Sequence, residues 1–140
     1  MTDAHEIEQL FDRYAAAVDA KDVDAFAELF DDDVRVFDMW EVWAYDGVDA
    51  WRETAREWLA SLGDESVAVA FEDVRVAFEG AMAVAHAFVR FAGVAATGEE
   101  LRSMQNRLTW ALRRTPRGWK IVHQHTSAPL DETAKAIFRR

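Results

Sequence analysis

The spacing of apolar residues changes at Gly63, and this change limits the possible folds more than any other feature of the chain. Before Gly63 the apolar residues mostly recur every three or four positions, which is the period of an amphipathic helix. After Gly63 the pattern predicts strands over 67–78, 82–91, 101–113 and 119–127. Helices followed by long strands that turn back on one another predict an α+β fold, in which the helices pack on one side of a curved, mostly antiparallel sheet.

The helical part of the sequence predicts three helices, over residues 4–20, 23–30 and 48–62. In the first helix, Tyr14 lies on the apolar stripe, so its hydroxyl is carried toward the core. Its plain interpretation is a core tyrosine with its hydroxyl bonded to a neighbour. Asp22 precedes the second helix and has the chemistry of an N-cap residue.

A strand is predicted over 34–40, and it carries Asp38 on the same face as two valines and Trp40. A carboxylate among apolar side chains costs free energy unless it is hydrogen-bonded or functional. Burial raises the pKa of a carboxyl group and makes it a better general base. The alternative is a structural acceptor bonded to Arg107, to a histidine or to a tryptophan indole. A bidentate arginine partner would argue against a base, whereas an open apolar cavity near Tyr14 would favour one.

The strand Trp119–Ser127 alternates at period two and places His123 and His125 on one face. That face is either the polar wall of a pocket or an exposed surface, for example in a subunit interface. With His86 and Asp38, the two histidines could also form a metal site. The spacing is unspecific, and we expect hydrogen-bonding imidazoles instead, with no metal and no cofactor.

Composition excludes several classes of function. The net charge of −10 argues against nucleic acid and anionic membrane surfaces as partners. The chain has no cysteine, which excludes disulfides and thiolate chemistry. The N-terminus is polar and acidic rather than a signal peptide, and no apolar run is long enough to span a membrane. We therefore expect one cytoplasmic domain that covers residues 1–140.

Tryptophans are frequent and could line an aromatic pocket for a flat or polycyclic ligand. The candidates are Trp40, Trp43, Trp58 and Trp110. Taken singly, each is more often a core residue. No Walker loop, dinucleotide fingerprint or calcium loop is present.

Two runs of the sequence resemble the NTF2-like superfamily, within its SnoaL-like and ketosteroid-isomerase-like branch. The more specific run is Trp119-x-Ile121-Val122-His123-x-His125-x-Ser127-x-Pro129, which is also similar to the last strand of the calcium/calmodulin-dependent kinase II association domain. The other is Arg13-Tyr14, then Asp22, Leu29-Phe30-x-Asp32-Asp33 and Asp38. The resemblance implies a cone-shaped fold, usually a homodimer or a larger assembly, with a pocket between the helices and the concave sheet.

The same resemblance implies roles for two residues. Asp38 falls where the isomerase has its general base, and Tyr14 where it has an oxyanion-hole hydroxyl. The isomerase's second oxyanion donor is a protonated aspartate, an established example of a neutral buried acid. Here the matching stretch, 105–109, has no carboxylate, which departs from the steroid-isomerase pattern.

These observations predict a small-molecule-binding homodimer that carries out cofactor-free acid–base chemistry on an apolar molecule with a carbonyl or carboxylate. The expected catalytic residues are Asp38 and Tyr14. The expected substrate-binding residues are Trp40, Trp58, His86, Arg107, Trp110, His123 and His125. The alternative is a non-catalytic ligand-binding or oligomerisation module of the same fold.

Overall fold

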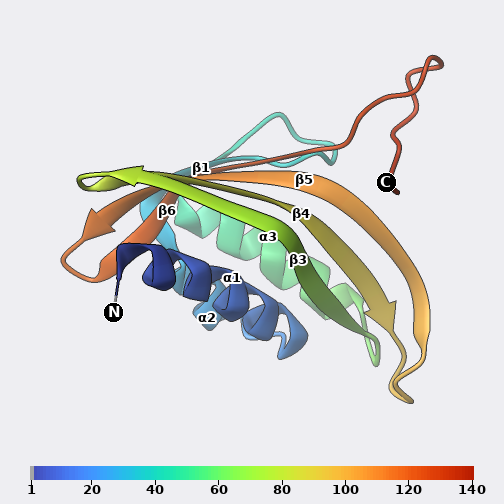
Figure 1. Cartoon of the computed structure of the whole chain (residues 1–140). Coiled ribbons are helices and arrows are strands. Elements are labelled where there is room, and N and C mark those ends of the chain that lie inside the picture. The colour runs from blue at the N-terminus through green and yellow to red at the C-terminus, as the bar shows by residue number, and fades with distance from the viewer. Residues whose placement is uncertain (1) are drawn as a thin grey trace.

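The computed structural model describes residues 2–140 of the protein. The chain forms the helices and strands labelled in Figure 1. The helices are α1 (Asp3–Asp19), α2 (Val23–Glu28) and α3 (Val48–Ser61). The strands are β1 (Phe30–Phe37), β2 (Tyr45–Asp46), β3 (Ser66–Glu79), β4 (Met82–Val94), β5 (Glu100–Thr115) and β6 (Gly118–Ser127).

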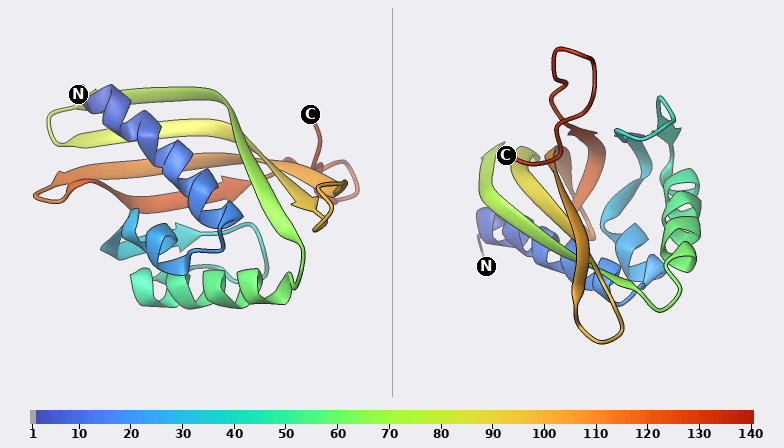
Figure 2. Two further views of the ribbon diagram at one scale, coloured as in Figure 1. Left: turned by 90° about the horizontal axis from the view of Figure 1, so that it is seen from below. Right: turned by 90° about the vertical axis from the view of Figure 1, so that its right-hand side faces the viewer.

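The six strands form one curved sheet in the order β2-β1-β6-β5-β4-β3. The β1–β6 pair is parallel and the other pairs are antiparallel. Figures 1 and 2 show the helices along the concave side of this sheet, with α1 across β3 and α3 beside β1. The predicted α+β fold with a curved sheet is therefore confirmed.

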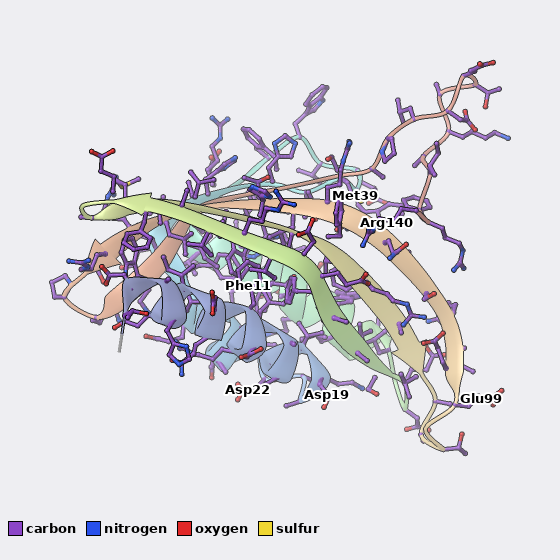
Figure 3. The ribbon with its side chains drawn as sticks, in the orientation of Figure 1. Phe11, Asp19, Asp22, Met39, Glu99 and Arg140 are labelled. Carbon is purple, nitrogen blue, oxygen red and sulfur yellow. The ribbon has the colours of Figure 1, made fainter. Side chains whose placement is uncertain are left out.

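Helix α1 packs on the sheet through its apolar stripe, in which Ile7, Leu10, Phe11, Tyr14 and Val18 are buried. The ring of Phe11 lies between α1 and the sheet (Figure 3) and stacks on Trp110 of β5 with a centroid distance of 4.1 Å. Loss of such a buried ring costs about 3–5 kcal/mol in comparable cores. The aromatic contact therefore fixes the position of α1, and with it the position of Tyr14.

The side of the sheet that faces the helices, called here the inner face, carries small or apolar side chains from β4. Ala83, Ala85 and Val89 are buried there, whereas Val84 and His86 alternate onto the exposed outer face. This alternation follows from the pleat of a strand. The inner face thus belongs to the core and the cavity, and the outer face to solvent.

Two segments differ from the sequence prediction. Strand β1 ends at Phe37 instead of residue 40, so Asp38 and Trp40 lie in the loop that precedes β2. The second helix ends at Glu28, because Phe30 already pairs with Ile121 of β6. Within residues 2–140, no helix is both long and apolar enough to cross a membrane.

The last residues of the chain form no helix; after β6 they leave the sheet in a projecting loop, closed by an isolated bridge between Leu130 and Ala136, and bend back (Figure 1). The backbone N–H of Gln105 donates to the Phe138 carbonyl at 2.6 Å. The Phe138 ring stacks on Trp40 at 5.4 Å between centroids. The C-terminal segment is therefore attached both to β5 and to the loop that carries Asp38.

Candidate functional site

A cavity of about 530 Å³, called here the inner cavity, opens between the helices and the inner face of the sheet. Its aromatic lining comes from five elements and from the loop after β1, and consists of Tyr14, Phe26, Trp40, Tyr45, Trp51, Trp58 and Phe91. Its polar lining consists of Asp38, Glu41, Thr54, Asn106, Gln124 and Thr126. A mostly aromatic cavity with a few converging polar groups is typical of small-molecule sites.

Asp38 lies in the cavity wall directly after β1, where its carboxylate is bonded to a hydroxyl and not to a cation. Thr126 Oγ1 donates to Asp38 Oδ1 at 3.1 Å, and the Met39 backbone N–H donates to the same Thr126 oxygen at 3.0 Å. Burial raises the pKa of the Asp38 carboxyl above its ordinary value; bonds from Thr126 and from the backbone at Trp40 and Met39 only partly oppose this. The result is a carboxylate that accepts a proton more readily than an exposed one.

Tyr14 reaches the same cavity from α1. Its ring packs edge-on against Phe26 at 5.1 Å and against Phe71 at 5.5 Å. Burial is the main cause that raises the pKa of the Tyr14 hydroxyl, and the nearby charge of Asp38 raises it further. The hydroxyl therefore stays neutral across the physiological range and can only act as a hydrogen-bond donor or acceptor, not as a phenolate.

Of the aromatic residues predicted to bind a ligand, Trp40 and Trp58 line the cavity. Trp110 does not, because its ring is fully buried behind the wall against Phe11. Its indole Nε1 donates to Gln124 Oε1 at 2.9 Å, and Gln124 does line the cavity. Trp110 is therefore not placed to contact a ligand, as predicted, but holds the lining residue Gln124 in position.

The prediction that histidines form the polar wall is wrong for this cavity. Strand β6 contains a bulge: Ile121 pairs with Leu112 and His123 with Ala111, which leaves Val122 without a partner in β5. The extra residue reverses the alternation, so that Ile121 lies on the inner face while His123 and His125 lie on the outer one.

Gln124 and Thr126 occupy the inner positions instead, between the histidines. No strong sequence signal identifies these two residues, because the bulge that turns them inward is not visible in a period-two pattern. Asn106 on β5 likewise faces the cavity, whereas the adjacent Arg107 faces outward.

The remaining predicted side chains make contacts away from the inner cavity. His123 Nδ1 lies 2.7 Å from the Arg35 carbonyl oxygen, and the His125 ring packs on Phe37 at 5.5 Å. His86 is exposed and pairs across the sheet with Thr109.

Arg107 Nε donates to Ser127 Oγ at 3.1 Å, on the outer face of the sheet. It therefore does not pair with Asp38. Among residues 2–140, no cluster of three or more histidine, aspartate and glutamate side chains is placed to hold a metal ion.

Solved structures with the same fold include three that align with most of the chain. An NTF2-like protein of unknown function from Pseudomonas putida has 27% identity, a TM-score of 0.85 and coverage of 100% of this chain and 98% of its own. An NTF2-like protein with a cystatin-like fold from Novosphingobium aromaticivorans has 24% identity and a TM-score of 0.78, with coverage of 94% and 86%. A protein from Xanthomonas campestris, provisionally assigned as a calcium/calmodulin dependent protein kinase II association domain, has 18% identity and a TM-score of 0.76, with coverage of 92% and 89%.

A comparison with the curated proteins finds no match. The sequence pattern of the SnoaL-like domain, in contrast, matches residues 7–131, which include every strand and helix except the first residues of α1. The chain therefore belongs to the SnoaL-like domain family and has the NTF2-like fold.

Proposed function

We propose that this protein binds a small, largely apolar carbonyl compound in the inner cavity and converts it by cofactor-free acid–base chemistry, as an isomerase or a cyclase. The observation that carries the proposal is the state of Asp38: it is bonded to Thr126, has no cationic partner and shares the cavity with the Tyr14 hydroxyl. A bidentate arginine would lower the pKa of this carboxyl group, and the outward-facing Arg107 does not provide one.

In the proposed reaction, Asp38 takes a proton from the carbon next to the substrate carbonyl. The electron pair of that C–H bond moves into the new C=C bond of an enolate, while the carbonyl oxygen becomes negative. The Tyr14 hydroxyl donates a hydrogen bond to this oxygen, and such donors are worth most where water is excluded. Return of the proton from Asp38 to a different carbon completes an isomerisation. In a cyclisation the enolate carbon attacks a second carbonyl, the π electrons of that carbonyl move onto its oxygen, and the resulting alkoxide takes the proton back from Asp38.

The test is the conversion of a bicyclic β,γ-unsaturated ketone to its conjugated isomer, followed by ultraviolet absorbance. Wild-type protein is expected to turn the probe over, and Asp38→Asn to lower kcat by roughly 100-fold or more, the usual contribution of a general base. Asp64→Asn is the matched control, because Asp64 is exposed and lies outside the cavity. Equal kcat for Asp38→Asn and wild type would overturn the assignment of the base.

A second part of the proposal is that two copies associate through the outer face of the sheet. Val84 and Met82 of β4 are 47% and 43% exposed there and lie next to each other on the same face of the strand. Val84→Asp would place a charge in that contact. Light scattering is expected to give twice the chain mass for wild type and a monomer for the variant; a wild-type monomer would contradict this part.

A further inference from the structure

The exposed residues of the lining mark where the inner cavity opens to solvent. Of the described residues that line it, Trp40, Glu41 and Trp58 are the exposed ones, and the two tryptophans are 48% and 38% exposed. Trp40 and Glu41 lie in the loop after β1, whereas Trp58 lies on α3. The mouth of the cavity is therefore between this loop and α3, and a shift of Trp40 would change its width.

The loop after β1 is fixed at Met39 but not beyond it. The Met39 N–H donates to Thr126 Oγ1 at 3.0 Å, and the Met39 sulfur accepts from Asn106 Nδ2 at 3.4 Å. Within residues 2–140, residues 40–44 form no hydrogen bond with a helix or a strand. The Phe138 ring, however, stacks on the Trp40 indole at 5.4 Å with 26° between the planes. This stack is what holds Trp40 in place.

Phe138 lies beside β5, in the place that β6 would fill if it continued. The last pair of β5 with β6 is Arg107 with Ser127. Beyond that pair, the Gln105 backbone N–H donates to the Phe138 carbonyl oxygen at 2.6 Å, and the Arg140 backbone N–H donates to Gln105 Oε1 at 3.0 Å. The backbone on both sides of the Phe138 ring is therefore attached to the sheet.

Arg140 fastens the same segment to the outer face of the sheet (Figure 3). Its Nη2 lies 3.1 Å from Glu72 Oε2 of β3, and its guanidinium carbon lies 4.1 Å from the centre of the Phe88 ring of β4. Both side chains of the ion pair are largely exposed, and such pairs contribute little free energy. Residues 138–140, called here the C-terminal latch, are thus attached to three strands by contacts that can open reversibly.

The loop that projects before the latch is held together by its own hydrogen bonds. Asp131 Oδ1 accepts from the backbone N–H groups of Thr133 at 2.8 Å and of Lys135 at 3.1 Å. At its base, the Ile137 N–H donates to the Pro129 carbonyl oxygen at 2.8 Å. The latch can therefore leave the sheet while the projecting loop and β6 keep their structure.

We propose that Phe138 is a positioning residue: with Arg140 it holds Trp40 across the mouth of the inner cavity, and the cavity opens when the latch releases Trp40. Phe138 is not part of the lining, so it acts through Trp40. That this opening admits a ligand rests on the proposed function, whereas the opening itself does not depend on the chemistry of Asp38.

The chain has no cysteine, so a single introduced thiol can report how often the cavity opens. Ala55→Cys places a thiol on α3 in the buried lining, away from the contacts of the latch. Its reaction with neutral dithiodipyridine is followed by absorbance. Phe138→Ala is expected to raise the labelling rate on the order of tenfold, because one stacked aromatic pair is lost. Ile137→Ala removes an exposed apolar neighbour and is the matched control with an unchanged rate.

A double-mutant cycle tests whether Phe138 acts through Trp40. Trp40→Ala is expected to raise the labelling rate of Ala55→Cys by itself, and Phe138→Ala to add nothing in that background, since its ring has nothing left to hold. Phe138→Tyr keeps the stack and is expected to restore the wild-type rate. An equal effect of Phe138→Ala with and without the Trp40 ring would overturn the positioning role.

Two further variants separate opening of the latch from unfolding and from general charge effects. Ala17→Cys places a thiol in α1 that is buried outside the lining, so its labelling reports global unfolding and is expected to be the same with and without Phe138→Ala. Arg140→Gln is expected to raise the labelling of Ala55→Cys about threefold, because the ion pair and the contact with Phe88 are lost. Lys135→Gln removes an exposed cation of the projecting loop and should leave the rate unchanged.

The inference is overturned if Phe138→Ala leaves the labelling rate of Ala55→Cys at the wild-type value, or if it raises that of Ala17→Cys by the same factor. The proposed catalysis is tested separately, by turnover of the unsaturated ketone. Faster labelling in Phe138→Ala without any turnover by wild type would overturn the catalytic proposal and support the latch. Turnover by wild type with unchanged labelling in Phe138→Ala would do the reverse.

Discussion

The Thr126 hydroxyl of β6 donates to the Asp38 carboxylate across 3.1 Å, and this bond joins the last strand to the loop after β1. The two residues are 88 positions apart in the chain. They meet because β1 and β6 run parallel as neighbours, with Phe37 beside His125. The bond orients the proposed base and also limits how far burial can raise its pKa.

Removal of the Thr126 hydroxyl is predicted to move the pH dependence of turnover. The bond stabilises the charged form of Asp38, so Thr126→Val raises the pKa of that carboxyl further. The acid limb of kcat/KM for the unsaturated ketone is therefore expected to shift to higher pH. Thr126→Ser keeps the hydroxyl and serves as the control with an unchanged limb. A shift of the limb to lower pH in Thr126→Val would contradict the account.

Asp38→Asn is predicted to stabilise the protein against heat at neutral pH. The folded-state pKa of Asp38 is raised, so ionisation of this group costs the folded state more than the unfolded state. That cost is absent below the ordinary pKa of the unfolded chain and appears as the pH rises through the folded-state pKa. The gain in unfolding temperature over wild type is thus expected at pH 7 and should disappear near pH 3, as measured by calorimetry. A gain that is larger in acid than at neutral pH would have the wrong sign.

The buried pair of Trp110 and Gln124 is predicted to support both stability and the cavity wall. Gln124→Leu leaves the Trp110 indole N–H without its acceptor, which costs about 1–3 kcal/mol in urea unfolding. Trp110→Phe together with Gln124→Leu removes both partners of the bond. A double-mutant cycle is expected to give a coupling energy of about 0.5–3 kcal/mol for this contact. Strictly additive effects of the two substitutions would show that the bond contributes nothing.

His125 is predicted to be unimportant for the ligand. Its ring lies on Phe37 on the outer face, away from the inner cavity. His125→Ala is expected to turn over the unsaturated ketone with the kcat/KM of wild type, within about twofold. By contrast, Trp58→Ala removes an aromatic residue from the lining and is expected to lower kcat/KM for the same ketone. A loss of kcat/KM in His125→Ala as large as in Trp58→Ala would mean that His125 contributes to the site.

The sequence predicted the fold and part of the site for identifiable reasons. Tyr14 could be placed because a helical stripe has a strong period, and Asp38 because a carboxylate next to alternating valines is unusual. The histidines were misplaced by a single unpaired residue, Val122, since one extra residue in a strand sends the following side chains to the opposite face. Local patterns do not contain the cross-strand pairing that determines where a bulge forms.

The residues that complete the cavity could not be ranked from the sequence for a different reason. Thr126, Gln124 and Asn106 are ordinary polar residues in long strands. Whether such a residue lines a cavity depends on which side chains lie opposite it in the folded protein. Trp51 packs among aromatic rings like a core residue, and its unpaired indole N–H becomes apparent only when its surroundings are known.

A raised pKa of the Asp38 carboxyl is the property that a general base at this position requires, and it can be measured without any substrate. Carbon-detected NMR of the side-chain carboxyl, with Asp38→Asn to assign the signal, follows its titration directly. The titration midpoint of Asp38 is expected to lie clearly above the ordinary value of 3.8, because burial raises the pKa of this carboxyl. A midpoint at or below that value would mean that the carboxylate is stabilised rather than destabilised by its surroundings, and Asp38 would then not be poised to act as the base.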